Sequence, residues 1–191
     1  MPTSLVILAG GLSRRMGRDK AALPVAGSTL LSHLVARLRA TVDEVLVAGG
    51  TEPAIAGVRW IPDSLPGAGP LAGMAAGLEA AAGPAAWVVA CDLPDVEPAL
   101  GRLLFATLDG FEAAVPRPQG RVEGTCAVYS TALAPRIGAL LADGRHSVLS
   151  LLERSRVRYL AADELRPVDP ELRSFRNLNT PDDYARWLSE R

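Results

Sequence analysis

The sequence predicts an α/β protein, one domain over residues 1–191 with a mainly parallel, partly mixed central sheet. Three observations lead to this prediction. Short apolar runs of strand type alternate with segments whose apolar residues recur at helical spacing. Glycines or a carboxylate follow several of the apolar runs, as expected at the ligand-binding edge of a parallel sheet. The chain of 191 residues has the length of one ordinary domain.

The N-terminal third contains three predicted strands and one helix. Residues 5–9 form a continuous apolar run that ends in glycines, which is typical of a strand buried on both faces. Ser28 is a suitable N-cap for a helix over 30–38, where leucines recur at helical spacing. Residues 44–48 and 58–61 are the next two predicted strands, since both are short runs rich in β-branched and other apolar residues.

The middle of the chain continues this alternation. Residues 62–69 are rich in proline and glycine and are predicted to form a loop. A helix over 70–82 begins with a proline, which suits the first helical turn. The apolar run 85–91 is a buried strand with Asp92 at its carboxyl end, and a helix follows over 98–108.

The pattern departs from strict alternation after residue 109. Two strands are predicted over 111–115 and 122–129, joined by a turn-rich link over 116–121. This departure from strict βαβ order favours mixed pairing in this part of the sheet. The remaining predicted elements are helices over 131–142 and 147–154, a strand over 156–160 and a helix over 181–189.

Composition excludes several classes of protein. Hydrophobic residues make up 49% and charged residues 21%, so a disordered polar chain is excluded. The net charge of −1 gives no basic field, and nucleic-acid binding is not expected. No apolar run reaches the ~18–20 residues that cross a bilayer. Cys91 and Cys126 are too few for a disulfide framework, so we expect a cytoplasmic protein with no membrane association.

A positively charged, glycine-rich loop follows the first predicted strand. It carries Arg14, Arg15, Arg18 and Lys20 against one acid, Asp19. Lys20 is the chain's one lysine among 20 basic residues. Glycines allow backbone N–H groups to approach an anion closely, and the charges favour a polyphosphate. The spacing matches neither the P-loop nor the dinucleotide fingerprint, so the loop predicts a phosphate site of a third type; a solvated arginine-rich turn is the alternative.

Two carboxylates follow predicted strands. Asp92 stands at the carboxyl end of a buried strand, where ligands of such sheets bind. Mg²⁺ prefers one or two carboxylates together with waters and substrate phosphates, so Asp92 is a candidate metal ligand. Its alternative interpretation is a helix cap for the segment beginning near Asp95. Asp63 is a second acid just past a strand, and by itself it is typical of a turn.

Five segments together resemble the molybdopterin nucleotidyltransferases, and among them the guanylyltransferases. These segments are 8–20, 62–64, 69–73, 91–94 and 177–183, in the family's order and at about its spacing. The resemblance covers essentially the whole chain. It implies a Rossmann-like α/β fold and transfer of GMP from GTP to the terminal phosphate of molybdopterin, with release of pyrophosphate. The expected partners are these two substrates and proteins that deliver or receive the cofactor.

The resemblance also implies roles for individual residues. Leu8, Ala9, Gly10 and Gly11 would line the guanine and ribose. Arg15 and Lys20 would bind the triphosphate. Asp63 would contact the nucleoside, and Asp92 would hold Mg²⁺, the expected cofactor. Asn179 would lie close to the reacting centre, and Arg145 would face the acceptor.

Two positions bear on the choice of substrates. Related cytidylyltransferases carry alanine where Gly10 stands, and the missing methyl leaves room for a purine. Gly124-Thr125 departs from the Pro-Leu of relatives, at a place near the acceptor. Alternatives are a sister enzyme that uses CTP or a sugar-phosphate acceptor, a dinucleotide-dependent oxidoreductase, and a non-catalytic nucleotide-binding partner protein.

Overall fold

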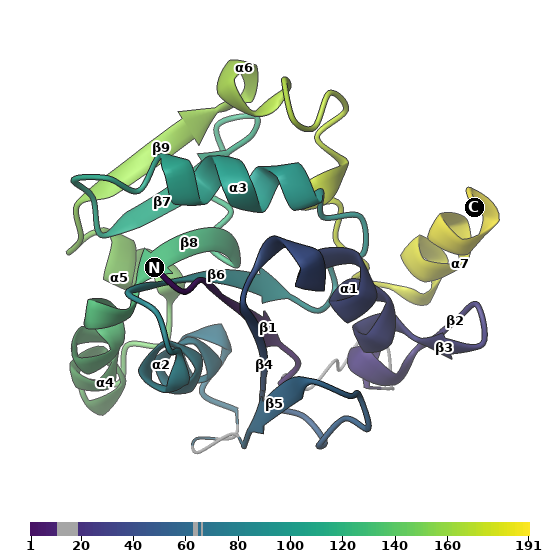
Figure 1. The fold of residues 1–191 in the computed structure, drawn as a ribbon, viewed down its shortest axis with the longest axis horizontal. Coiled ribbons are helices and arrows are strands. Elements are labelled where there is room, and N and C mark those ends of the chain that lie inside the picture. The colour runs from purple at the N-terminus through teal and green to yellow at the C-terminus, as the bar shows by residue number, and fades with distance from the viewer. Residues whose placement is uncertain (11–18, 63–64, 66) are drawn as a thin grey trace.

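The computed structural model describes residues 1–10, 19–62, 65 and 67–191. In this part of the chain, seven strands form one sheet in the order β5-β4-β1-β6-β8-β7-β9 (Figure 1). The strands are β1 (Ser4–Leu8), β4 (Glu44–Ala48), β5 (Val58–Ile61), β6 (Ala85–Ala90), β7 (Ala113–Arg117), β8 (Cys126–Ser130) and β9 (Val157–Ala161). All pair in parallel except β8, which is antiparallel to both of its neighbours. The predicted mainly parallel, mixed sheet is confirmed.

Helices cover both faces of the sheet and complete three layers (Figure 1). They are α1 (Leu30–Leu38), α2 (Pro70–Ala80), α3 (Pro98–Ala106), α4 (Ala134–Ala142), α5 (Val148–Leu152), α6 (Ala162–Leu165) and α7 (Pro181–Ser189). Buried residues of α1, α3 and α6 share one core cluster. Those of α2, α4 and α5 share the cluster on the opposite face. None of the helices in the described ranges is long and apolar enough to span a membrane.

The apolar run of β1 explains how one strand supports two cores. Leu5 and Ile7 pack into the cluster with α1 and α3, whereas Val6 and Leu8 pack into the cluster with α2 and α4. Successive side chains of a strand point to opposite faces, so a strand covered on both sides must be apolar throughout. The strand buried on both faces that the sequence predicted is therefore confirmed.

The N-terminal end of α1 corrects one prediction. Thr29, not Ser28, is the N-cap, and its Oγ1 accepts the N–H of Ser32 at 3.1 Å. Ser28 instead belongs to a two-stranded hairpin of β2 (Pro24–Val25) and β3 (Ser28–Thr29). Ala26 and Gly27 connect these strands with φ of 46° and 78°, the left-handed conformations that two-residue hairpin turns require. A hairpin this short has too few apolar residues to show in the sequence pattern.

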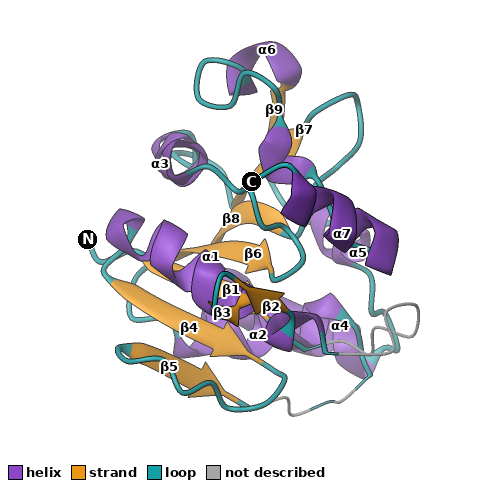
Figure 2. Cartoon of the chain, turned by 90° about the vertical axis from the view of Figure 1, so that its right-hand side faces the viewer, coloured by secondary structure: helices purple, strands orange, loops and turns teal. Residues whose placement is uncertain are grey.

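The C-terminal helix α7 packs on this hairpin. Leu23, Val25 and Leu30 form a small apolar cluster with Leu178 and Trp187. The hydroxyl of Tyr184 donates to the carbonyl of Pro24. Figures 1 and 2 show α7 beside β2 and β3, so the last helix lies next to the segment that follows the glycine-rich loop.

The second of the two successive strands begins later than predicted. β8 starts at Cys126, whereas the sequence pattern predicts strand from residue 122. The residues before it turn, because the N–H of Cys126 donates to the carbonyl of Glu123 at 3.1 Å. Residues 122–125 therefore precede the strand and do not belong to it.

The packing of α3 against β6 leads to a prediction about stability. A Cβ at Gly101 would lie 2.4 Å from the ring of Trp87, a core side chain that cannot withdraw. We expect Gly101→Ala to destabilise the fold by about 1–3 kcal/mol. The matched control is Gly138→Ala in α4, where a Cβ meets nothing within 4 Å and removal of glycine should stabilise by about 0.5–1 kcal/mol. Thermal melts of both variants measure the difference, and equal melting temperatures would contradict this account of the packing.

Candidate active site at the carboxyl edge of the sheet

The carboxyl ends of β1, β4 and β6 meet at one edge of the sheet. The N–H of Ala9 donates to the carbonyl of Ala48 at 2.9 Å, and the N–H of Cys91 donates to that of Leu8 at 3.1 Å. Gly50 has a φ of +65°, and a Cβ there would lie 3.0 Å from the carbonyl oxygen of Ala9. Glycine is therefore required where the second loop passes the first strand end.

This edge places Leu8, Ala9 and Gly10 as the sequence predicted, at the end of β1. The side chains of Leu8 and Ala9 are buried, whereas Gly10 is exposed. A ligand at this edge would therefore meet the backbone near Gly10. Gly11, Arg15 and Asp63, for which nucleotide contacts were expected, lie outside the described residues.

Three predicted site residues converge at the same edge. The Nζ of Lys20 lies 2.8 Å from Oδ2 of Asp92 and 3.2 Å from Oδ1 of Asn179. The side chains of Lys20 and Asp92 are only 15% and 19% exposed. Asp92 lies 72 positions after Lys20 in the sequence, and Asn179 lies 159 positions after it. The three residues contribute an ammonium, a carboxylate and an amide to one small cluster.

Local structure fixes each member of this cluster. Lys20 begins a 3₁₀ turn over Lys20–Ala22, and the carboxylate of Asp19 caps this turn by accepting the N–H of Ala21 at 3.0 Å. Asp92 follows β6, and its backbone carbonyl accepts the N–H of Leu178 at 2.9 Å. That hydrogen bond joins the C-terminal segment directly to the strand end that carries the carboxylate.

The start of α7 holds Asn179. Thr180 is the N-cap, and its Oγ1 accepts the N–H of Asp183. The carboxylate of Asp183 accepts in return from the N–H groups of Thr180 and Asn179 at 2.9 and 3.1 Å. These hydrogen bonds lower the pKa of Asp183. A capping box of this kind sets the angle at which the chain enters the helix, so Asn179 is directed toward Lys20.

The alternative interpretation of Asp92 as a helix cap is wrong. The following helix, α3, begins at Pro98 with Glu97 as its cap residue. The Asp92 carboxylate instead faces the ammonium of Lys20.

The donor set around Asp92 suits a cation that arrives with a nucleotide. Among the described residues, no group of three or more histidine, cysteine, aspartate or glutamate side chains is placed to hold a metal. Mg²⁺ instead keeps waters and phosphate oxygens and needs only one or two carboxylates. Asp92 therefore fits Mg²⁺ bound together with substrate phosphates.

Glu123 is a site residue that the sequence did not single out. Its side chain is 12% exposed, and its carboxylate lies 3.5 Å from Nε of Arg121. Burial raises the pKa of Glu123, and the positive charge of Arg121 opposes this effect. The N–H of Ala90, at the end of β6, donates to the carbonyl of Thr125 at 2.8 Å, so the turn that carries Glu123 is held at the strand end before Asp92. A single acid within a turn-rich, polar link gives no sequence signal of this burial.

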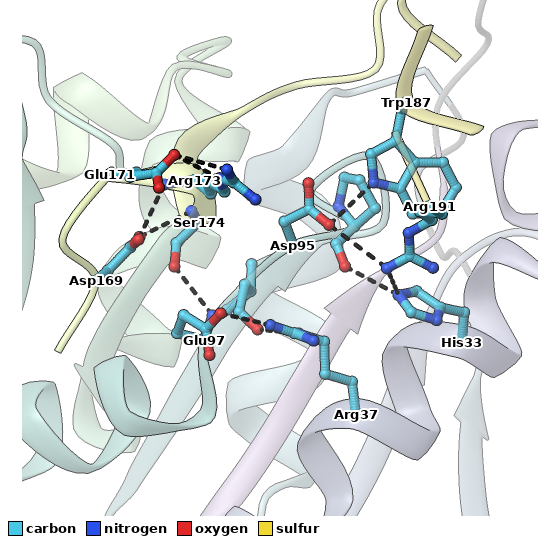
Figure 3. A network of polar contacts seen from close by, with 12 residues as sticks. His33, Arg37, Asp95, Glu97, Asp169, Glu171, Arg173, Ser174, Trp187 and Arg191 are labelled. Carbon is cyan, nitrogen blue, oxygen red and sulfur yellow. Dashed lines mark hydrogen bonds and ion pairs between the residues drawn. The ribbon is translucent and has the colours of Figure 1, made fainter. Parts of the chain in front are cut away.

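Side chains from three elements hold the segment that follows Asp92 (Figure 3). His33 of α1 places Nε2 3.0 Å from the carbonyl oxygen of Pro94. The indole Nε1 of Trp187 donates to Oδ1 of Asp95 at 2.9 Å, and Arg191 lies over the Trp187 ring. Burial lowers the pKa of His33, with the positive charges of Arg191 and Arg37 adding to this effect.

Two further hydrogen bonds continue this clamp. Arg37 of α1 donates through Nε to the carbonyl of Val96 at 2.7 Å and pairs with Glu97 at 2.6 Å. The N–H of Glu97 donates to Oγ of Ser174 at 2.9 Å. The backbone that carries Asp92 is thus fixed from α1, from α7 and from the segment after β9 (Figure 3).

Arg145 lies apart from the Lys20 cluster. It is exposed on the turn between α4 and α5. Its neighbour His146 places Nδ1 3.2 Å from the carbonyl oxygen of Ala68, in the loop that precedes α2. The structure therefore brings Lys20, Asp92 and Asn179 together and places Arg145 beside a different loop of the same edge.

Comparison with known proteins identifies relatives along the whole chain. Residues 5–159 match the family described as MobA-like NTP transferase domain. Relatives named "probable molybdenum cofactor guanylyltransferase" occur in Pelotomaculum thermopropionicum and Methanosarcina mazei. The first is 36% identical over 97% of this chain and 92% of the relative. The second is 37% identical over 97% of this chain and 89% of the relative.

A solved structure shares the fold closely. The molybdopterin-guanine dinucleotide biosynthesis protein A of Archaeoglobus fulgidus superposes with a TM-score of 0.85 at 27% identity, and the match covers 98% of this chain and 97% of that one. The α/β sheet with a charged cluster at its carboxyl edge and these relatives together define a nucleotidyltransferase. The chain belongs to the MobA-like NTP transferase family.

The two cysteines beside the site are predicted to be inert. Cys91 and Cys126 are buried and free, and burial raises the pKa of Cys91 to about 12. Burial also raises the pKa of Cys126. Since the thiolate is the reactive form, about one Cys91 side chain in 10⁴ is ionised at pH 8. We expect a thiol-specific disulfide reagent to label neither residue in the folded protein and both in denaturant. Rapid labelling of one equivalent under native conditions would contradict the assignment.

Proposed function

We propose that this chain transfers GMP from GTP to the terminal phosphate of molybdopterin or the molybdenum cofactor, releases pyrophosphate and forms the guanine dinucleotide of the cofactor. The observation that carries the proposal is the contact of Lys20 with both Asp92 and Asn179 at the carboxyl edge. The names and full-length similarity of the relatives supply the reaction class and the substrates.

The reaction mainly requires that the site stabilise the negative charges of the substrates and of the leaving pyrophosphate. An ionised phosphate of the acceptor is already a nucleophile and attacks the α-phosphorus of GTP, so no general base is needed. The difficulty is that two polyanions approach each other while charge builds on the leaving pyrophosphate. Lys20 would neutralise that charge from inside the edge, with Arg15 of the glycine-rich loop as its expected partner. Asn179 holds the Lys20 ammonium in place through its amide oxygen.

Asp92 would hold Mg²⁺ when the nucleotide is bound. The ion would supply Lewis-acid polarisation of the phosphates at that carboxylate. The Lys20 ammonium pairs with this carboxylate at 2.8 Å. A Mg²⁺ ion held by Asp92 would take the place of that ammonium, and Lys20 would then be available to the triphosphate.

The donor and acceptor occupy different parts of the edge in this proposal. The backbone around Leu8, Ala9, Gly10 and Gly11 faces guanine and ribose, and the absent methyl at Gly10 leaves room for a purine. Asp63 contacts the nucleoside. Asn179 lies on the acceptor side, and Arg145 is proposed to reach the acceptor from the α4–α5 turn. A cytoplasmic location is proposed as well, since both cysteines are free thiols.

Removal of either charge in the central pair should disable transfer. We expect Lys20→Ala and Asp92→Ala each to lower the rate of GMP transfer at least about 10²-fold, because each loses one charge placed at the reacting phosphates. The assay measures pyrophosphate release from GTP with purified molybdopterin and Mg²⁺. Arg102→Ala and Glu79→Ala, exposed on α3 and α2, are the charge-matched controls. Turnover within a few-fold of the unmodified protein, with an unchanged melting temperature, would remove the residue concerned from the mechanism.

Lys20→Arg tests why this position is a lysine, although the other basic residues of the chain are arginines. The Lys20 ammonium lies 2.8 Å from the Asp92 carboxylate and 3.2 Å from the Asn179 amide oxygen. Arginine keeps the positive charge, but its planar guanidinium is larger than an ammonium and cannot take the same position between these two groups. We expect about a tenfold or greater loss of kcat with GTP binding retained. Wild-type kcat in this variant would show that charge alone matters.

A further inference from the structure

A cavity of about 310 Å³ is lined in part by Glu123. Two segments line it, the link over 118–123 between β7 and β8 and the segment over 171–176 after β9. Its volume is at the lower end of those that hold small organic ligands. The N–H of Ala90, at the end of β6, donates to the carbonyl of Thr125 at 2.8 Å, and the N–H of Leu178 donates to the carbonyl of Asp92 at 2.9 Å. Both lining segments are therefore joined to the strand end that carries Asp92.

Buried hydrogen bonds build the wall of this cavity. Asp169 is 3% exposed, and its carboxylate accepts the N–H groups of Arg173 and Ser174 at 3.0 and 2.9 Å. Ser174 in turn accepts the N–H of Glu97 (Figure 3). The wall that presents Glu171 and Arg173 is therefore tied to the same segment that carries Asp92.

The backbone of the lining is strained on both sides. Gln119 and Leu172 have φ of 66° and 55°, in the left-handed region that side chains other than glycine rarely adopt. Among the described residues, three residues other than glycine have a positive φ, and two of them line the cavity. Strained conformations of this kind cluster at ligand sites, where the surrounding structure holds them.

The lining alternates cations and carboxylates. Glu171 pairs with Arg173 through two contacts of 2.7 and 2.9 Å. Glu123 faces Arg121, and Arg176 pairs with Glu190. A phosphate would meet carboxylates beside every arginine. A planar heterocycle with both donors and acceptors on its edge suits these paired arginines and glutamates. Guanidinium groups donate to ring acceptors, and carboxylates accept from ring N–H groups. Phe175 and the arginine planes offer stacking surfaces.

We propose that this cavity binds the pterin ring system of the acceptor and so places the acceptor's phosphate toward Asp92 and Lys20. The proposal rests on the function proposed above, because it assigns the acceptor's ring to a site next to that reacting centre. Glu171 would accept from the ring's amino edge, and Arg173 would donate to its acceptor atoms. Neither residue belongs to the phosphate-binding cluster.

A titration with neopterin, a stable pterin that lacks the phosphate, tests the cavity directly. The chain is saturated with GTP and Mg²⁺, and binding is followed by pterin fluorescence. We expect saturable binding that weakens about tenfold in Glu171→Gln and in Arg173→Ala, since each loses a hydrogen-bond partner of the ring. Glu79→Gln and Arg102→Ala, which remove the same charges from α2 and α3, should bind neopterin as the unmodified chain does.

Each outcome decides one claim. Absence of saturable neopterin binding overturns the proposal, and so does equal neopterin affinity in the cavity and control variants. The proposal is also overturned if Glu171→Gln and Arg173→Ala weaken the binding of inorganic phosphate and leave the binding of neopterin unchanged. In transfer assays the two cavity variants should raise KM for molybdopterin and leave kcat and GTP affinity unchanged. Failure of the unmodified chain to bind GTP would overturn the proposed function instead, and neopterin binding without GTP would still report on the cavity.

Discussion

The contact between Lys20 and Asp92 is the interaction on which the site depends. It lies where a buried strand ends, and two other features of the described residues support it. The capped turn at Asp19 presents the lysine, and the hydrogen bond from Leu178 to the Asp92 carbonyl brings Asn179 to the same place. A mostly buried carboxylate is costly to leave without a partner, and Lys20 supplies that partner at 2.8 Å.

The sheet topology divides the edge into two halves. On one side of Asp92 lie the ends of β1, β4 and β5, all parallel, with the backbone and glycines that suit a nucleotide. On the other side the antiparallel strand β8 intervenes, and the links around it form the cavity beside Glu123. The hydrogen bonds from His33 of α1 and Trp187 of α7 hold the segment that follows Asp92, between these two halves.

Much of this arrangement is predictable from sequence, for identifiable physical reasons. Buried parallel strands need continuous apolar runs, and their carboxyl ends share one edge, so Lys20 and Asp92 could be placed together in advance. The helix cap at Thr29 could not be predicted from the sequence, because Ser28 and Thr29 are both common cap residues. The short hairpin of β2 and β3 decides between them. Glu123 and the cavity were missed because burial of a polar link depends on contacts with residues about 50 positions later.

The decisive experiment is a calorimetric titration of the protein with GTP, CTP, ATP and UTP, with and without Mg²⁺. We expect GTP to bind selectively and Mg²⁺ to strengthen its binding, since the ion would replace the Lys20 ammonium at the Asp92 carboxylate. Binding that ignores Mg²⁺ would contradict the exchange at Asp92. Preference for CTP would contradict the role of Gly10, and absence of binding by all four nucleotides would contradict the assignment of this edge as a nucleotide site.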